Sequence, residues 1–260
     1  MIVLIHSSKT MRQRDNTTPR QNPLFASDAI AIQQALAEYS VPQIQTLMHI
    51  SKPLAIKTVE TIRSWLAEKN HASPTIDSFI GDIYSGLRSD DFNEDDREYA
   101  NSHLRILSGL YGILRPLDTI QPYRFEMGYR LPLAPHSSMY EFWGTRIAQT
   151  LPQDELIVHA SSQEYIKVIE PYIDEKRIIA PTFLTIHPDT LKPIFVAVHA
   201  KIARGAYARW IIKNRIESIN DLPLFSDLGY QYDSTLSSPS KPVYIAVEFK
   251  GLGLSQRLKV

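Results

Sequence analysis

The stretch 93–128 constrains the fold of this chain more than any other, because a strong helix start leads into an apolar segment that prolines then stiffen. Asn93 is a good helix N-cap, and the three acids that follow it suit the positive end of the helix dipole. Apolar residues then recur at helical spacing as far as Leu114, and Pro116 cannot continue a helix. The pattern therefore predicts one amphipathic helix that begins at Asn93 and ends just before Pro116.

Residues 115–128, which follow this helix, mix charged and apolar side chains without a regular period. Their prolines stiffen the backbone, and apolar residues such as Phe125 can anchor the segment against a core. A stiff, anchored loop can aim Arg115 and Arg124 at an anion. A surface loop with internal ion pairs explains the same composition, so both interpretations remain open.

The composition is that of an ordinary soluble globule, with 43% hydrophobic and 22% charged residues in a chain of 260. No linker or internal repeat divides the sequence, so we expect a single unit over residues 1–260. The absence of cysteine excludes disulfides, thiolate metal sites and cysteine nucleophiles. The apolar start is too short for a signal peptide, and no apolar run approaches a membrane span. We therefore expect a cytoplasmic protein without contact to a membrane.

Strand and helix patterns alternate in the first two thirds of the chain and then give way to a run of strands. Strands are expected around Val3, Ile80, Val158, Ile179, Val196 and Ile245, with residues 178–186 and 193–199 paired as a hairpin. Helices are expected over residues 26–38, in two pieces over 41–67, over 138–151, after Ser162 and over 200–216. A loop is expected over residues 225–241. This order predicts an α/β or α+β fold with a mixed β-sheet flanked by helices.

The two short helices on either side of residues 51–53 are compatible with a helix-hairpin-helix, a motif that contacts phosphates through the N–H groups of its turn. Lys52 and Lys57 would supply the charge. The turn lacks the glycines expected of the DNA-binding version, and an ordinary helical hairpin explains the same pattern.

The helix over residues 200–216 carries five basic residues and no acid, although the net charge of the whole chain is zero. At 100° per residue, Lys201, Arg204 and Arg215 fall on one side of this helix. Gly205 would let a ligand approach closely beside Arg204. The stripe predicts either an anion-binding face or a solvated one.

Two further candidate positions follow short strands. Lys9 lies just after the first strand, at the edge where open α/β sheets place their sites. Asp82 follows the strand near Ile80, where it can orient a neighbouring arginine or cap the next turn.

Motifs for several kinds of chemistry are absent from the sequence. It contains no Walker A loop, no GxGxxG fingerprint and no GxSxG nucleophile elbow. The eight histidines are dispersed, without an HExxH motif, so neither a metal site nor a cofactor is expected. The remaining charged residues suit the binding of an anion in a cleft better than they suit any named reaction.

The central stretch reads LSGLYGILRPLDTIQPYRFEMG over residues 107–128 and is followed by YEFWG over 140–144. Further motifs are Lys9–Thr10, GDIYSGL over 81–87, Ser162 with Glu164–Tyr165, and AKIARG over 200–205. In this order they closely resemble the signature of the YaaA peroxide-stress family, and the similarity runs almost end to end. The chain departs from the family pattern at residues 6–8, His-Ser-Ser instead of Ser-Pro-Ala, and at Ile80, where family members carry lysine.

The resemblance implies one compact α/β unit with a positively charged cleft. It also implies a protein of the response to hydrogen peroxide that restrains intracellular iron and binds duplex or distorted DNA. We therefore expect a protein that binds DNA independently of its sequence and limits oxidative damage. The residues expected to contact DNA are Lys9, Lys52, Lys57, Arg105, Arg115, Arg124, Lys201 and Arg204, with Tyr111 and Tyr123 stacked on an extruded base. The acids expected to hold these cations in position are Asp82, Glu126 and Glu164.

The alternative hypothesis is an enzyme that acts on a nucleobase or a phosphorylated metabolite in the same cleft, with Glu126 or Glu164 as acid or base. Buried paired charges suit an active site as well as a DNA groove, so the sequence leaves both open. Direct iron binding is the weakest hypothesis, because the histidines are dispersed and cysteine is missing. The sequence does not fix the oligomeric state.

Overall fold

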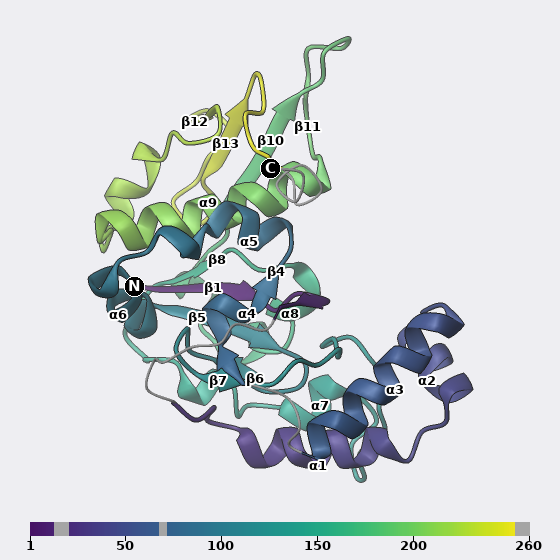
Figure 1. Ribbon diagram of the computed structural model, residues 1–260. Helices are drawn as coiled ribbons and strands as arrows, with labels where there is room; N and C mark the ends of the chain where they lie inside the picture. The colour runs from purple at the N-terminus through teal and green to yellow at the C-terminus, as the bar shows by residue number, and fades with distance from the viewer. Residues whose placement is uncertain (13–20, 68–71, 253–260) are drawn as a thin grey trace.

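The first strand, β1 (Ile2–His6), lies in the middle of the main sheet of the computed structural model, which describes residues 1–12, 21–67 and 72–252 (Figure 1). The order of this sheet is β6-β5-β1-β8-β9, with β5 (Leu104–Ser108) and β8 (Ile157–His159) parallel to β1 on either side. β9 (Ile178–Ile179) is parallel to β8, and β6 (Gly112–Leu114) is antiparallel to β5. Residues 2–5 are at most 1% exposed, which explains why this central strand is apolar on both faces.

A second sheet has the order β11-β10-β13-β12. Its central strands β10 (Thr182–Ile186) and β13 (Val243–Ala246) are parallel to each other. β11 (Pro193–Ile194) is antiparallel to β10, which confirms the predicted hairpin, and β12 (Tyr230–Tyr232) is antiparallel to β13. Two short antiparallel pairs join β2 (Thr10–Met11) to β4 (Phe79–Ile80) and β3 (Ser73–Pro74) to β7 (Thr119–Ile120).

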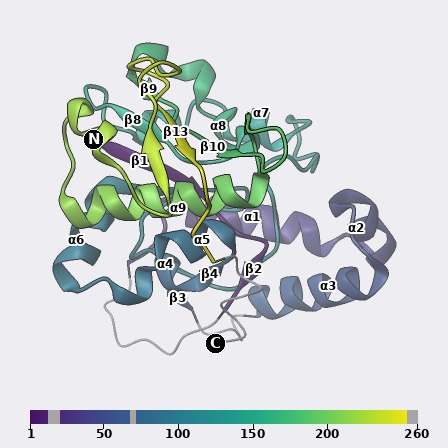
Figure 2. The ribbon, with the colours of Figure 1, turned by 90° about the horizontal axis from the view of Figure 1, so that it is seen from above.

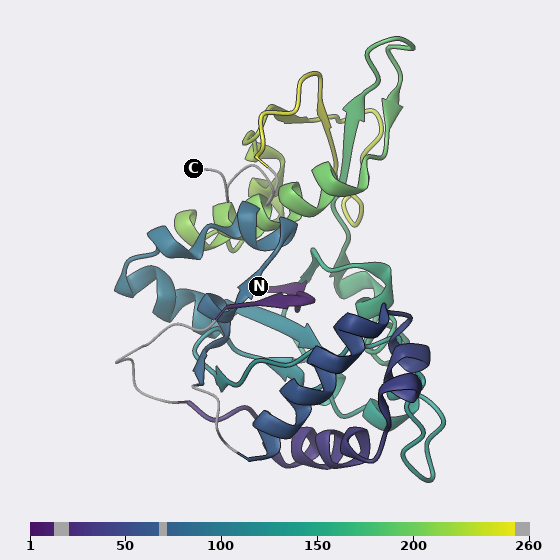
Figure 3. The ribbon, with the colours of Figure 1, turned by 45° about the vertical axis from the view of Figure 1, so that its right-hand side comes forward.

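The longest helix, α9 (Ala197–Asn214), lies between the two sheets and contacts α5 (Asp82–Leu87), β1 and β10 (Figures 1 and 3). The three helices α1 (Ala26–Ala37), α2 (Val41–Met48) and α3 (Lys52–Leu66) extend to one side of the main sheet (Figure 2). The remaining α-helices are α4 (Thr75–Ser78), α6 (Glu94–His103), α7 (Met139–Trp143) and α8 (Gln163–Ile166). Short 3-10 turns cover Ser89–Asp91, Ala148–Thr150, Glu170–Tyr172, Glu175–Arg177 and Ile219–Leu224.

These described elements form one compact mixed α/β unit, which confirms the predicted fold class. Within the described ranges, no helix combines the length and the apolar character needed to cross a membrane.

The predicted helix over residues 93–115 is only half correct. Its start is confirmed, because the Asn93 side chain accepts a hydrogen bond from the Asp96 N–H at 2.8 Å in a capping box. The helix ends at His103, however, and the apolar run that follows becomes β5, paired with β1 in the register Val3↔Leu104. A continuous apolar run satisfies the helical period and also suits a strand buried on both faces, so the pairing with β1 decided its conformation.

Smaller differences lie in the second half of the chain. Residues 197–199 were expected in a strand and instead begin α9. The segment 225–241 was expected to be a loop, yet it contributes β12 to the second sheet. The helix expected over 138–151 is confined to α7 and one 3-10 turn.

The helical hairpin of α2 and α3 matches the predicted pair of helices. Ser40 and Gln43 form a capping box at the start of α2, and His49 ends it in the left-handed conformation with φ of 51°. α2 and α3 pack against each other, and α3 also contacts α1. A DNA-binding role for this hairpin, and hence the helix-hairpin-helix interpretation, stays a prediction.

The crossing of α5 and α9 is tight because two glycines face the opposite backbone. A Cβ atom at Gly86 would lie 1.9 Å from the carbonyl oxygen of Ile202, and one at Gly205 would lie 1.8 Å from that of Ile83. Gly205 therefore lets a helix approach, whereas the sequence suggested the approach of a ligand. The crossing holds the N-terminal half of α9 above the C-terminal end of β1.

We predict that Gly205→Ala lowers the free energy of unfolding by about 1–3 kcal/mol or more, because the added methyl group forces the two helices apart. Urea denaturation of the wild type and the variant measures this change. At a glycine in an open helix position the change in the free energy of unfolding would have the opposite sign, because replacement by alanine there stabilises the protein by about 0.4–1 kcal/mol. A gain in stability would therefore contradict the packing role of Gly205.

Candidate functional site

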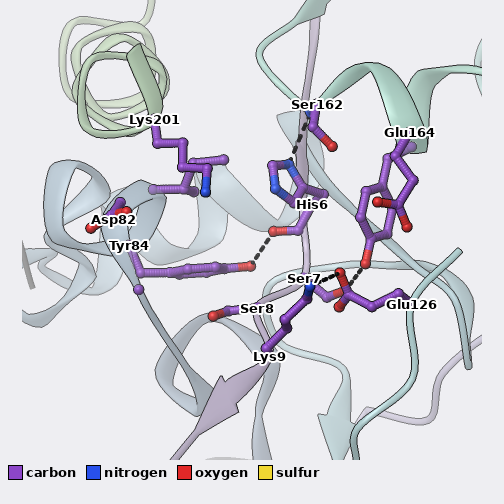
Figure 4. A pocket seen from close by; sticks show the side chains of 13 residues that line it. His6, Ser7, Ser8, Lys9, Asp82, Tyr84, Glu126, Ser162, Glu164 and Lys201 are labelled. Atoms are coloured by element: carbon purple, nitrogen blue, oxygen red, sulfur yellow. Dashed lines mark hydrogen bonds and ion pairs between the residues drawn. The ribbon is translucent and has the colours of Figure 1, made fainter. Parts of the chain in front are cut away.

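A cavity of about 390 Å³ lies at the C-terminal end of β1, where parallel sheets commonly place their ligands (Figure 4). It is lined by residues 6–9 after β1, by residues 81–84 at the start of α5, and by Glu126, Ser162, Glu164, Tyr165 and Lys201. Five segments that are far apart in the sequence therefore meet at the cavity. We refer to it below as the β1 cavity.

Glu126 is a largely buried acid of the β1 cavity, with 8% of its surface exposed. Its Oε2 lies 3.7 Å from Nζ of Lys9, whose side chain remains 57% exposed. Burial raises the pKa of Glu126 above its ordinary value, Glu164 adds to this effect, and Lys9, Tyr165 and Arg124 act against it. Glu126 is therefore an acid that the fold biases towards its protonated form.

Glu164 lies in the first turn of α8, on the same side of the cavity as Glu126 (Figure 4). Its Oε1 accepts a hydrogen bond from the Gly128 N–H at 2.8 Å. The Tyr140 hydroxyl donates to the backbone carbonyl of Glu164 at 2.9 Å. These contacts fix this carboxylate relative to the segment that carries Glu126.

His6, the last residue of β1, forms part of the opposite wall. Its Nδ1 accepts a hydrogen bond from the Ser162 N–H at 3.1 Å, and its ring stacks on that of Tyr165 with centroids 4.8 Å apart. Burial, followed by the charges of Arg204 and Lys201, lowers the pKa of His6 to about 3. His6 is therefore neutral near pH 7, with its proton on Nε2.

Four of the predicted cations gather around the β1 cavity. Lys9 and Lys201 line it directly. Arg124 donates to the carbonyl oxygen of Lys9 at 3.2 Å. Arg204 is half-buried and lies close enough to His6 and His159 to lower the pKa of both.

Arg105 and Arg115 do not reach the β1 cavity, which corrects the expectation that all the motif cations converge. They line a separate pocket together with Asp118. Arg115 donates to Oδ1 of Asp118 at 2.8 Å and 3.0 Å, and Arg105 donates to the backbone carbonyls of Asn101 and Leu104. Arg105 pairs with Leu4 in the middle of β1, whereas the cavity lies beyond the end of that strand.

Tyr111 and Tyr123 are 4% and 5% exposed, so neither ring is free to stack on a base in this structure. The Tyr123 hydroxyl shares a hydrogen bond of 2.6 Å with Ser108 Oγ, and the two tyrosine rings meet edge to face. The expected stacking role conflicts with this burial, because aromatic residues of an apolar motif can equally pack in the core.

The remaining predicted residues divide between the cavity and the surface. Asp82, the first residue of α5, lines the β1 cavity as expected. Lys52 and Lys57 are exposed on α3 and do not line it. Arg215 binds Asp96 at 3.2 Å and does not join Lys201 and Arg204.

Sequence reasoning missed His6, Tyr84 and Tyr165 as lining residues. The Tyr84 hydroxyl donates to the carbonyl oxygen of His6 at 3.0 Å, and that of Tyr165 shares a hydrogen bond with Ser7 Oγ at 3.1 Å. His6 could have been found from its place at the end of an apolar parallel strand. The tyrosines occur within the GDIYSGL and Ser162–Tyr165 motifs, but nothing in the sequence separates them from core residues.

The cavity offers acid–base and binding groups, and two of its three serines are held by other residues. Ser7 is buried and engaged by Tyr165, and Ser8 Oγ donates to the carbonyl oxygen of Ile80 at 2.5 Å. Among residues 1–12, 21–67 and 72–252, no group of three histidine, aspartate or glutamate side chains is arranged to hold a metal ion.

We predict that Glu126→Gln raises the free energy of unfolding near neutral pH. The folded state raises the pKa of this carboxyl above its ordinary value. The contribution of the carboxyl to the free energy of unfolding is therefore fully favourable below the ordinary pKa and is lost as the pH rises through the raised pKa. The variant should therefore be more stable than the wild type at about pH 7 and nearly equal to it at about pH 4. Urea denaturation at both pH values measures the difference.

Glu60→Gln is the matched control, because it replaces an exposed carboxylate on α3. It should change the stability little at either pH. A stability difference for Glu126→Gln that stays the same at both pH values would count against the raised pKa.

Comparison with known proteins places the chain in a family. The sequence model of the family described as peroxide stress protein YaaA matches residues 1–236. A UPF0246 protein of Salinispora tropica is 46% identical over 258 residues, which cover 99% of this chain and 98% of that relative. UPF0246 proteins of Roseobacter denitrificans and Burkholderia mallei are 35% and 36% identical, each covering 94% of this chain and 98% of its relative. The chain therefore belongs to the YaaA family of peroxide stress proteins.

Proposed function

We propose that this protein acts in the cytoplasm during peroxide stress by binding DNA independently of its sequence. The bound protein limits oxidative damage to the DNA and takes part in restraining intracellular iron. The family membership supports the link to peroxide, and the family resemblance supports DNA and iron. The site we assign to DNA is the β1 cavity with its rim.

The grouping of cations around one cavity carries this proposal. Lys9, Arg124, Lys201 and Arg204 come from three separate parts of a chain whose net charge is zero. Among the described residues, neither Lys201 nor Arg204 forms an ion pair with an acid. Clustered cations without acidic partners are costly, so their retention supports an anionic ligand such as a DNA phosphate.

The size of the cavity supports the entry of one nucleotide rather than of a duplex. Its volume of about 390 Å³ is within the range of small-molecule sites. In this arrangement the DNA backbone crosses the rim and a single nucleotide is extruded into the cavity. The free energy needed to extrude a base is lowest where the base is already unpaired or damaged, and this supports a preference for distorted DNA.

We predict a steep salt dependence of DNA affinity. Each phosphate contact contributes about −0.9 to the slope of log affinity against log salt, so four contacts give a slope of about −3.6. Lys201→Ala should reduce this slope by about one contact and weaken binding on every sequence tested. Fluorescence anisotropy with a duplex and with a mismatched duplex, over a series of salt concentrations, measures both quantities.

Lys192→Ala is the matched control, since Lys192 is an exposed lysine between β10 and β11, outside the lining of the β1 cavity. It should leave the affinity and the slope unchanged. Absence of DNA affinity at low salt, or an affinity that does not vary with salt, would refute the proposal.

A second candidate function is an enzyme that acts on the nucleotide held in the cavity. The observation that favours it is the position of Glu126, which is largely buried, faces the cavity and lies 3.7 Å from Lys9. A carboxyl with a raised pKa beside a lysine is a common arrangement for proton transfer.

The two functions predict different outcomes for Glu126→Gln. In a binder, this variant should retain DNA affinity and protect cells from peroxide nearly as well as the wild type. In an enzyme, it should retain affinity but lose protection, because general acid–base catalysis contributes about 10²–10⁴-fold in rate. DNA affinity and survival of peroxide, measured together for Glu126→Gln and Arg124→Ala, separate the cases. Arg124→Ala should lose both readouts under the DNA-binding proposal.

A further inference from the structure

Lys201 of α9 lines the β1 cavity, and Arg204, one turn further along the same helix, is not among the lining residues. Within the part of the chain that the structure describes, neither the Lys201 ammonium nor the Arg204 guanidinium makes a hydrogen bond or an ion pair. The two side chains are one turn apart on α9, and both lie close enough to His6 to lower its pKa. The packing of Gly205 on α5 holds this turn of α9 in place.

His6 adds a third donor close to these two side chains. Its Nδ1 accepts the Ser162 N–H, so the proton of the neutral ring is on Nε2. Nε2 makes no hydrogen bond with any residue of the described ranges, and Figure 4 shows this edge of the ring turned towards Lys201. A neutral histidine can donate one hydrogen bond to an anion at physiological pH without having to gain a proton.

The opposite wall has the reverse character. Glu126 and Glu164 lie side by side there, with Lys9 in contact with Glu126 (Figure 4). Asp82 also lines the cavity, on the same side as Lys201 (Figure 4), and no ion pair joins the two in the described structure. The free donors of Lys201 and His6 therefore lie at one end of the cavity, together with Asp82, and the two glutamates lie at the other end, where Lys9 contacts Glu126.

We propose that Lys201, Arg204 and the Nε2–H of His6 form a phosphate subsite, and that the ligand of the β1 cavity is a nucleotide whose base faces Glu126 and Glu164. This assignment rests on the proposed function, because it concerns the same cavity. An arginine with a neighbouring lysine suits a phosphate, whose oxygens accept several charged hydrogen bonds at once. Carboxyl oxygens accept hydrogen bonds from the amino and imino groups of bases, and the carboxylate of Glu164 disfavours a phosphate at this end.

Buried tyrosines bound the space between the two ends of the cavity. Tyr84 and Tyr165 both line the cavity, and Tyr165 stacks against His6 at the boundary between the two ends. Tyr84 and Tyr165 are 8% and 1% exposed, so they shape this space and are not free to stack on a base. Because a phosphate is the same in every nucleotide, the subsite orients the ligand without selecting a DNA sequence.

The test compares ligands that differ only in the phosphate. Isothermal titration calorimetry with 2′-deoxyadenosine 5′-monophosphate and with 2′-deoxyadenosine should show tighter binding of the phosphorylated probe by about 10- to 100-fold, as expected for charged hydrogen bonds. A dinucleotide with one internal phosphodiester tests whether the subsite takes a phosphate within a strand or only a free monoester. Either result supports the subsite and identifies its source of phosphate.

Variants then test which residues cause the preference for the phosphorylated probe. Lys201→Ala should remove most of it, and the exposure of Lys201 makes this variant safe for folding. Arg204→Gln should do the same, with its circular dichroism and melting temperature checked against the wild type because Arg204 is half-buried. Lys192→Ala, the matched control, should keep the full preference. Equal binding of the two probes, or a preference that Lys201→Ala leaves unchanged, would overturn the subsite.

The subsite and the DNA-binding proposal can fail separately. Salt-dependent affinity for a duplex without any preference for the phosphorylated probe would overturn the subsite and leave DNA binding in place. A preference for the phosphorylated probe that Lys201→Ala removes, without affinity for DNA, would uphold the subsite and reject the DNA-binding proposal. In that case the cavity takes a free phosphorylated metabolite.

Discussion

The close crossing of α5 and α9 is the contact on which the site depends. Gly86 and Gly205 leave the two backbones in direct contact, so a side chain at either position would separate the helices. This packing places Lys201 and Arg204 above the end of β1 and brings Asp82 and Tyr84 to the same cavity. A helix held by backbone contact cannot rotate freely, so its charged side chains keep a fixed direction relative to the sheet.

Burial and charge together divide the groups of the cavity into roles. Burial shifts Glu126 towards its protonated form and His6 towards its neutral form, so two groups that would be ionised or titrating in water carry less charge here. Lys9 and Lys201 line the same cavity with side chains that reach the solvent. The site therefore combines exposed cations at its rim with hydrogen-bonding groups of reduced charge inside, an arrangement suited to holding a ligand that is anionic at one end.

Cations with an acidic partner and cations without one are located differently in this fold. Arg97 binds Asp77 through two hydrogen bonds of 2.9 Å, Arg115 binds Asp118, and Lys213 binds Asp96 at 2.6 Å. Each of these acids is buried, so the pairs join segments of the structure and leave no charge available to a ligand. Lys201 and Arg204 have no such partner among the described residues. An acidic partner therefore separates the structural cations from those available to a ligand. The spacing of basic residues in the sequence does not reveal which cations have such a partner.

The sequence by itself determined the elements whose signal is local. The apolar run of β1, the capped start of α6 and the break between α2 and α3 all follow from short-range preferences of the backbone and side chains. It also placed Lys9, Asp82, Glu126, Glu164 and Lys201 among the candidate residues, and all five line the β1 cavity. Only the tertiary structure decided that the helix ends at His103, because the following run gains its backbone partners from β1. It also decided that Arg105, Arg115 and Tyr123 lie outside the cavity and that His6 lies within it, since these outcomes depend on contacts between segments distant in the chain.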